Sequence, residues 1–133
     1  MKLSTAKVIG DILFAMKINR IADKDAKAVL TKDFLALRKA VKDADNDRDE
    51  IAKKFRDDWA DEMGKAEKSA EYKKAEAEAN ASLFELYEKE ADIELQPVKA
   101  ELLYDPDLWG ENDTLGQIAN SVNLLIKSGV ASE

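Results

Sequence analysis

Residues 25–63 contain neither glycine nor proline, and this uninterrupted segment constrains the fold more than any other feature of the chain. Within it, apolar residues recur at alternating spacings of four and three, which is the heptad pattern of a helix that packs along another helix. Such a helix would be roughly 60 Å long at about 1.5 Å per residue. Asp23 is the expected N-cap and Gly64 the expected end. The seam consists of Leu30, Phe34, Leu37, Val41, Ala44, Arg48, Ile51 and Phe55, with Arg48 as its polar member.

Alternating aspartates in the middle of this segment, VKDADNDRDEIAKKF (41–55), raise the question of a calcium-binding loop. An EF-hand loop needs glycine at its sixth position for a sharp turn and glutamate at its twelfth as a bidentate ligand. Counted from Asp43, these positions hold Arg48 and Lys54. The heptad seam also continues through the segment. We therefore interpret Asp43, Asp45, Asp47 and Asp49 as charged residues on the solvent side of the long helix.

Two further helices are predicted to pack along this spine. The segment 66–91 is rich in Ala, Glu and Lys, which favour helix, and it would fold back after Gly64 to form an antiparallel hairpin. In the expected register, which holds to within a few positions, Asn80 faces Arg48 and Phe84 faces Ala44. The N-terminal segment, from a cap at Ser4 or Thr5 to about Arg20, has apolar residues at helical spacing and would cover the other half of the spine.

The pattern of apolar and polar residues changes after Ala91. Apolar and polar residues alternate through DIEL and the pattern breaks at Pro97, which predicts an extended segment or short strand. The turn-rich loop YDPDLWGEND (104–113) follows, and we expect Trp109 to lock it onto the rest of the protein. A last helix is predicted from Thr114 to Lys127, capped by Asp113 and followed by Gly129 at C′. Its expected inward residues are Leu115, Ile118, Ala119, Val122, Leu125 and Ile126.

These elements predict a mainly α protein with one domain, residues 1–133. Its main feature would be a long antiparallel helical hairpin, a coiled-coil-like arm of about residues 45–81. The N-terminal helix, the short extended segment and the C-terminal helix would form a small head, of about residues 1–44 and 82–133. The terms head and arm refer to these ranges below.

The composition excludes several kinds of chemistry. Histidine and cysteine are absent, which removes the usual general base near neutral pH, thiolate metal ligands and disulfides. No nucleophile-and-base motif and no glycine-rich phosphate loop is present. We therefore predict no catalytic residue, no cofactor and no enzymatic activity. Carboxylates in the loop 104–113 could form a metal site, but their spacing matches no known metal loop, and we favour an acidic surface turn over a metal site.

The net charge of −7, with no basic stripe to offset it, argues against nucleic acid as a partner. The apolar run near the N-terminus is interrupted by Asp11 and Lys17, which argues against a membrane segment or an export signal. A protein partner remains the expected kind of ligand.

Trp59 is the most prominent candidate for contact with such a partner. It lies near the expected tip of the arm, in the acidic sequence RDDWADEM (56–63). A large aromatic side chain exposed at a tip often anchors a partner, and in that case Trp59, Met63, Asp58 and Glu62 would form the binding site. Trp59 could equally pack across the hairpin on Ala66 or Ala70.

Four segments of the chain have counterparts in known proteins: MKLSTAKVIGDIL, DKDAKAVLTKDFLALRKAVKDADNDRDEIAKKF, ELYEKEADIELQPVKAELL and GQIANSVNLLIK. They resemble a family of small proteins from tailed bacteriophages and prophages that has no assigned biochemical function. The resemblance covers most of the chain and is least in 66–81 and 104–113. It supplies no catalytic residues.

This resemblance implies a phage origin, a location in the bacterial host cytoplasm or the virion, and a structural or virion-assembly role through helix-mediated protein contacts. The partner would then be a phage structural protein or a second copy of the chain. The alternative is a phage-encoded adaptor or inhibitor of a host protein.

Overall fold

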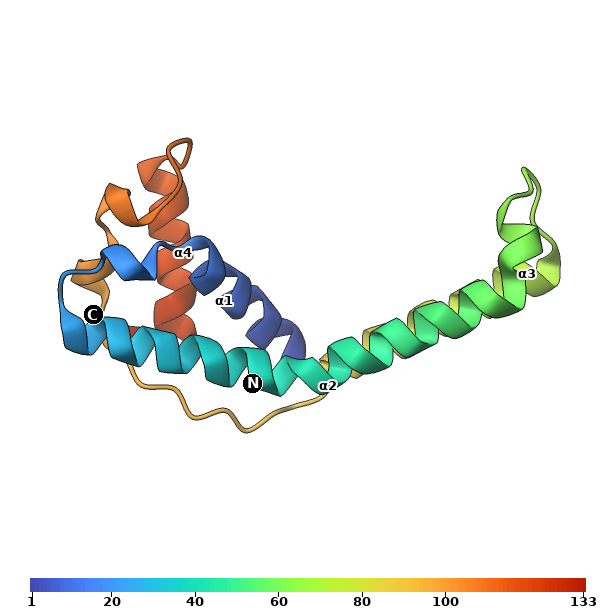
Figure 1. Ribbon diagram of the computed structural model, residues 1–133, viewed down its shortest axis with the longest axis horizontal. Coiled ribbons are helices and arrows are strands. Elements are labelled where there is room, and N and C mark those ends of the chain that lie inside the picture. Colours follow the sequence, from blue (N-terminus) through green and yellow to red (C-terminus); the bar gives the residue numbers. More distant parts are fainter.

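A single helix, α2 (Lys24–Met63), runs through the whole length of the molecule in the computed structural model, which describes residues 1–133 (Figure 1). Its N-terminal half lies in the head, and α3 (Ala70–Glu88) runs back along its C-terminal half to form the arm. The Asp23 carboxylate accepts hydrogen bonds from the backbone N–H groups of Asp25 and Ala26, and Gly64 follows the last residue of the helix. The fold is therefore mainly α, with the long helical hairpin that the sequence predicts.

The head combines the N-terminal half of α2 with α1 (Leu3–Ala15), α4 (Leu115–Ser128) and a small parallel sheet. The sheet pairs β1 (Val98–Lys99) with β2 (Ala131–Ser132), a strand that was not predicted. Short 3₁₀ turns lie at Ile18–Arg20, Ala100–Leu103 and Pro106–Leu108. The predicted extent of α1 was wrong at both ends: the helix begins directly after Lys2, with no side-chain cap, and it ends at Ala15 instead of Arg20.

The hydrophobic core lies in the head. Every buried residue except Tyr72 falls outside the range 45–81. Fully burying a large aliphatic side chain stabilises a fold by about 1.5–3 kcal/mol, so the head holds most of the stability that comes from apolar burial. The largest fully buried apolar side chains are Ile9, Leu13, Leu30, Leu37, Leu103, Leu108, Ile118, Val122, Leu125 and Val130.

The two ends of α4 agree with the sequence prediction only in part. Thr114, not Asp113, is the N-cap: its hydroxyl accepts from the N–H of Gln117, whose side chain accepts from the N–H of Thr114 in return. Asp113 instead accepts from the N–H of Gly110 and closes the preceding turn. Gly129 has a φ of 87° and ends the helix as predicted. The prediction that Leu115 and Ala119 lie inward was wrong, since both are exposed.

The register of the hairpin differs from the predicted one. Residues 64–69 form a loop and α3 begins at Ala70, where Ser69 caps it by accepting from the N–H of Tyr72. The predicted turn lay at Gly64, and the loop that is found instead moves the facing residues by about one turn: Asn80 lines a pocket with Ile51 and Phe55 of α2. Neither of the two predicted contacts forms. Phe84 is exposed instead of facing Ala44, and Arg48 forms ion pairs within its own helix instead of meeting Asn80.

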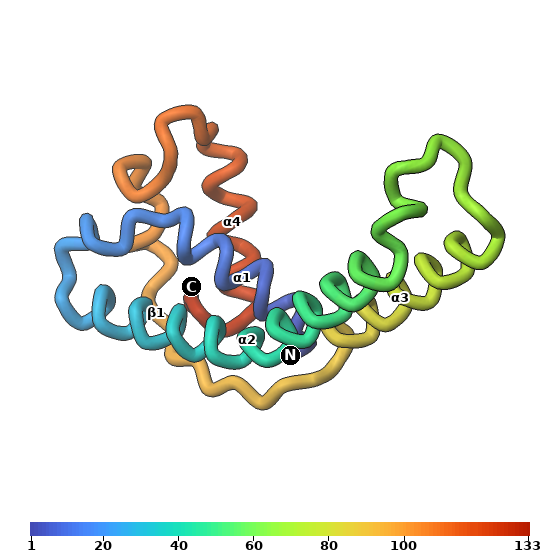
Figure 2. The backbone as a smooth tube through the Cα atoms, turned by 45° about the vertical axis from the view of Figure 1, so that its right-hand side comes forward, coloured from blue at the N-terminus to red at the C-terminus, as the bar shows by residue number.

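The extended segment 89–97, which we call the strap, returns from the arm to the head. It passes α2 on the side opposite to α1, as two views of the backbone show (Figures 1 and 2). Ile93 and Leu95 are half-buried against the core, whereas Asp92 and Glu94 are exposed, which is the predicted alternation. The start of α1 is tied to this segment by backbone hydrogen bonds, among them the one from the N–H of Ala91 to the carbonyl of residue 1.

A buried carboxylate holds the far end of the strap. Asp33 of α2 is 2% exposed, and its Oδ1 accepts a hydrogen bond of 3.0 Å from the N–H of Gln96. Its Oδ2 is buried without a partner. Burial raises the pKa of the Asp33 carboxyl above its ordinary value, because the hydrogen bond from Gln96 and the nearby charge of Lys32 only partly offset the loss of solvent.

We expect Asp33→Asn to raise the melting temperature near neutral pH. Asparagine keeps an oxygen for the N–H of Gln96 and removes a buried charge, and a buried polar atom without a partner costs more when it is charged. A gain of about 1 kcal/mol corresponds to roughly 3–5 °C for a domain of this size.

The pH dependence of this gain follows from the raised pKa. The folded protein binds the Asp33 proton more tightly than the unfolded chain, so the destabilisation is complete above the folded-state pKa and fades as the pH falls toward the ordinary value of 3.8. Thermal melts of the wild type and the variant at neutral pH and at about pH 4 should therefore converge at the lower pH. A variant that melts below the wild type near neutral pH would contradict the assignment of an unfavourable buried charge.

Candidate functional site

The tip of the arm is formed by the last two turns of α2, the loop 64–69 and the first turn of α3 (Figure 1). At Trp59, α2 departs from helical geometry, with φ −125° and ψ 18°, and the end of the helix bends away from the arm axis. This bend accompanies a cluster of three aromatic rings, Phe55, Trp59 and Tyr72, whose centroids are 5.4–6.5 Å apart. Edge-to-face aromatic pairs contribute about 0.5–1.5 kcal/mol each beyond burial, and they are the main apolar contact that holds the tip together.

Trp59 is half-buried in this cluster. Its ring meets that of Tyr72 across the hairpin at 5.7 Å and an interplanar angle of 86°. The alternative that Trp59 packs across the hairpin is therefore correct in kind, although its partner is Tyr72 and not Ala66 or Ala70. Part of the Trp59 surface remains open to solvent.

The loop at the tip is fixed by two charged side chains. The Glu62 carboxylate accepts from the N–H of Ser69 at 2.6 Å, and hydrogen bonding with Ser69 lowers the pKa of Glu62. The Lys68 ammonium donates to the carbonyls of Glu62 and Met63 at the end of α2 and of Lys65 in the loop after it. Glu62 therefore has a role in shaping the loop, whatever else it contacts.

The remaining acidic residues of the tip are uncommitted. Asp57, Asp58 and Asp61 form no ion pair and no side-chain hydrogen bond, and the Met63 side chain is 42% exposed. A shallow hollow of about 340 Å³ is lined by Trp59 and the surrounding carboxylates. Three of the predicted binding residues, Asp58, Trp59 and Glu62, line this hollow together. Met63 lies beside them in the chain but does not line it.

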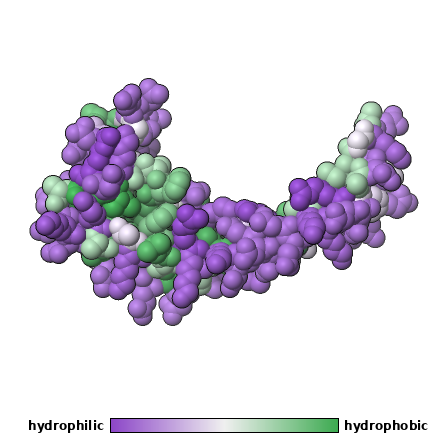
Figure 3. All heavy atoms as spheres, viewed as in Figure 1, coloured by the Kyte–Doolittle hydropathy of each residue, from purple (hydrophilic) through white to green (hydrophobic).

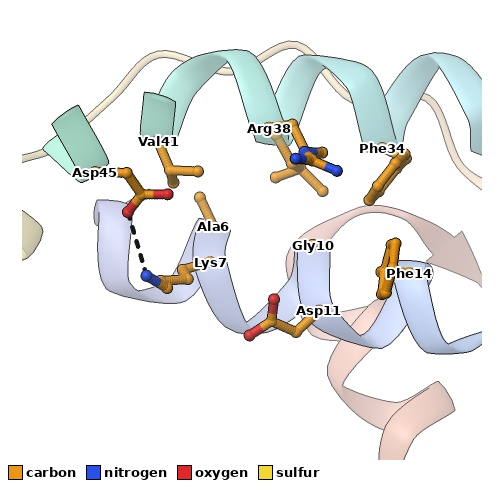
Figure 4. A pocket seen from close by; sticks show the side chains of 10 residues that line it. Ala6, Lys7, Gly10, Asp11, Phe14, Phe34, Arg38, Val41 and Asp45 are labelled. Atoms are coloured by element: carbon orange, nitrogen blue, oxygen red, sulfur yellow. Dashed lines mark hydrogen bonds and ion pairs between the residues drawn. The ribbon is translucent and has the colours of Figure 1, made fainter. Parts of the chain in front are cut away.

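A second concave feature, the head groove, lies between α1 and α2 (Figure 4). It has a volume of about 290 Å³, and small residues on α1, Ala6 and Gly10, line its floor toward α2. At one end the rings of Phe14 and Phe34 stack with centroids 6.2 Å apart, although Phe14 is 73% exposed. The guanidinium of Arg38 lies 5.6 Å from the centre of the Phe34 ring. Sequence reasoning missed this groove, because its walls come from different helices.

The other end of the head groove is a joint between the head and the arm. The Asp45 carboxylate accepts from the Lys7 ammonium at 3.2 Å and from the Tyr87 hydroxyl, and it lies 3.5 Å from Arg48. Burial by itself would raise the pKa of Asp45, but the hydrogen bonds from Tyr87 and Lys7 outweigh it and hold the pKa below its ordinary value. This carboxylate therefore connects α1, α2 and α3.

The interpretation of the aspartate-rich segment 41–55 is thus correct in its main point and wrong in one residue. The segment is helical throughout, as predicted. Asp43, Asp47 and Asp49 are exposed on the helix, whereas Asp45 is half-buried at the joint.

The acidic loop 104–113 uses its carboxylates to shape the backbone. Asp105 accepts from the N–H of Asp107, and Asp113 closes the turn at Gly110. No group of three or more carboxylates in the structure is arranged to hold a metal ion. Trp109 is buried and its indole N–H donates to the carbonyl of Leu103 at 2.7 Å, so it locks this loop onto the head as predicted.

Comparisons with protein families, with curated proteins and with solved structures found no match. The similarity to small tailed-phage proteins therefore stays a prediction. None of the helices combines the length and the apolar character that crossing a bilayer requires.

Proposed function

We propose that the protein acts by binding another protein chain through the tip of its arm. The observation that carries this proposal is the arm itself: it extends away from the core and presents an aromatic cluster and uncommitted carboxylates at its end (Figure 1). A projection of this kind adds little to the stability of the head, so we expect its function to be contact with another molecule. We do not propose catalysis, because the chain contains neither histidine nor cysteine and shows no nucleophile-and-base motif.

The chemistry of the tip indicates the kind of surface that it would bind. Aromatic side chains in partly buried positions are typical anchors of protein interfaces. The carboxylates around Trp59 would favour a partner surface with lysine or arginine around an apolar pocket, because opposite potentials guide association. The hydrophilic flanks of the arm separate this surface from the apolar parts of the head (Figure 3).

We further propose that this binding serves virion assembly in a tailed phage, with a phage structural protein as the partner. This part rests on the resemblance of the four segments described above. The alternative, an adaptor or inhibitor of a host protein, uses the same tip and differs only in the source of the partner.

Replacing Trp59 by alanine should abolish partner binding while the head stays folded. Tagged protein would be used to capture partners from phage-infected bacteria, and each captured protein would then be purified and its affinity for the tip measured directly. Phe84→Ala is a matched control, since Phe84 is an aromatic residue of α3 that is 67% exposed and lies away from the tip. We expect at least a hundredfold loss of affinity for Trp59→Ala, in the range of an interface hot spot, and no loss for Phe84→Ala.

The identity of the partner decides between the two proposals. A portal, tail or capsid protein supports virion assembly, and a host protein supports the adaptor. A partner that binds equally well after residues 56–72 are replaced by a short glycine linker would move the binding surface to the head and contradict the role of the tip.

A further inference from the structure

The exposed face of α2 changes the sign of its charge midway along the helix. This face lies opposite the buried residues Leu30, Leu37 and Val41, at 100° per residue around the helix axis. The net charge of the whole chain, −7, hides the separation, which the sequence analysis overlooked when it found no basic stripe. The N-terminal half of the face carries the exposed cations Lys24, Lys32, Lys39 and Lys42 with one anion, Asp25, and the C-terminal half carries the exposed anions Asp43, Asp49, Glu50, Asp57 and Asp61 with the cations Lys53 and Lys54.

Nearly all of these charges lack partners within the protein. Of the twelve residues, only Asp49 takes part in an ion pair, which it forms with Arg48. The basic half contains one exposed apolar residue, Leu35, which is 59% exposed and lies between Lys32 and Lys39 on the same face. An exposed leucine between unpaired cations resembles a contact surface more than a solvated flank.

The helix dipole does not account for this arrangement, because it favours the opposite one. Anions are stabilised near the N-terminus of a helix and cations near the C-terminus. The last turn of α2 has no basic residue and ends in Asp61 and Glu62. The positive charge at that end comes from Lys68 in the following loop. Asp23 and Asp25 at the start of α2 follow this rule, but the lysines of the first half and the anions of the last turn do not, so the dipole does not explain the charge separation.

We infer that this face of α2 binds the same face of a second copy in antiparallel orientation. A surface that is basic in one half and acidic in the other is complementary to itself after a two-fold rotation, which is what an isologous dimer requires. The occupant is thus a second copy of this chain. The inference rests on the proposed function only in taking the protein to act through protein contacts, and it uses a surface other than the aromatic tip.

The spacing of the charges fits one register of such a pair. Lys32 and Lys39 are seven residues apart, and so are Glu50 and Asp57, so both lysines can face both carboxylates of an antiparallel partner at once. With the two-fold axis beside Ala44 and Asp45, Lys32 faces Asp57 and Lys39 faces Glu50, and the symmetry repeats both pairs.

The cations within the acidic half do not oppose this register. Lys53 then lies across from Ala36, and Lys54 lies across from Leu35, whose side chain the aliphatic stem of a lysine can cover. Each of these two lysines lies about one helical turn from the partner's Lys32 and Lys39, so it weakens the attraction without opposing either lysine directly. The contact is mainly ionic, so it should weaken as salt screens exposed charges.

A charge-exchange experiment tests this inference. One variant combines Lys32→Glu with Lys39→Glu, which places glutamates opposite Glu50 and Asp57 of the partner; the other combines Glu50→Lys with Asp57→Lys, which places lysines opposite Lys32 and Lys39. Each variant alone should associate with itself at least tenfold more weakly than the wild type, because like charges then face one another. An equimolar mixture of the two should form the dimer again. Sedimentation velocity at low and high salt measures the association of each variant alone and of their mixture. Far-UV circular dichroism checks that the variants stay helical.

The control is the pair Lys73→Glu and Lys74→Glu, which makes the same change in net charge at exposed positions of α3 and should leave the dimer intact. A wild-type protein that stays monomeric at high concentration would overturn the inference, as would a dimer that persists in both variants alone. Binding of a double-stranded oligonucleotide by monomeric wild type, lost in Lys32→Glu with Lys39→Glu, would instead assign the basic half to nucleic acid. Trp59→Ala should dimerise like the wild type, so a failure here is distinguishable from a failure of the tip.

Discussion

Leu37→Ala should destabilise the protein by about 3–5 kcal/mol, whereas Leu35→Ala on the same helix should change its stability by less than about 0.5 kcal/mol. Leu37 is fully buried at the contact of α2 with α1, where its Cβ would lie 3.9 Å from a side-chain carbon added at Gly10. Truncating it leaves a cavity between α1 and α2, and such a cavity costs free energy in addition to the lost burial of the side chain. Leu35 faces solvent and leaves no cavity.

Urea unfolding at low protein concentration, followed by circular dichroism, measures both free energies. The two variants remove the same atoms from the same type of helix position, so their difference reports burial alone. Equal losses for Leu35→Ala and Leu37→Ala would show that the helix faces are assigned wrongly. A loss for Leu35→Ala that appears only at high concentration would point to its role between two copies.

Trp109→Ala should also cost about 3–5 kcal/mol, which is the usual range for a buried tryptophan. Its ring fills the space between the loop 104–113 and the head, and its indole N–H is bonded to a buried carbonyl, that of Leu103. Trp109→Phe isolates the hydrogen bond, because phenylalanine keeps much of the apolar surface and leaves the carbonyl unpaired. We expect that variant to lose about 1–3 kcal/mol.

The other tryptophan provides the comparison. Trp59→Ala removes aromatic contacts in the arm, where little is buried, and should cost no more than about 2 kcal/mol. Guanidinium unfolding of the Trp109 and Trp59 variants should therefore separate clearly. If Trp59→Ala destabilises the whole protein as much as Trp109→Ala does, the arm contributes to the stability of the head far more than its burial indicates.

The parts of the fold that could be predicted are those that neighbours in the sequence decide. The N-cap at Asp23, the end of α2 at Gly64 and the left-handed residue Gly129 depend on side chains and backbone groups within a few positions. The start of α3 was missed although a local signal exists: Ser69 followed by Glu71 is a common way to begin a helix. Reading it would have given the longer loop and a better register for the arm.

The features that could not be predicted join segments that are far apart in the chain. Asp33 reads as an ordinary polar residue of a helix until the strap brings the N–H of Gln96 to it. Asp45 looks equivalent to its neighbouring aspartates until Lys7 and Tyr87 converge on it. No spacing rule within one helix encodes which segment will cover which side of it, so these contacts emerge only from the tertiary fold.

The predicted binding residues fall between these two cases. Asp58, Trp59 and Glu62 line one hollow because they lie in consecutive turns of the same helix, which sequence spacing captures. The half-buried state of Trp59 depends on Tyr72 of the opposite helix and on the bend at the tip, which spacing does not capture.

The chain leaves the head in α2 and returns to it through α3 and the strap. The arm is therefore an insertion between two segments that pack into the same core. Its length can therefore change without altering that core. Adding seven residues to each helix would keep the heptad phase and move the tip about 10 Å further from the head. Removing seven would draw it in by the same distance. The distance between head and tip is therefore set by the number of helical turns in the arm, and it can change in steps of one heptad.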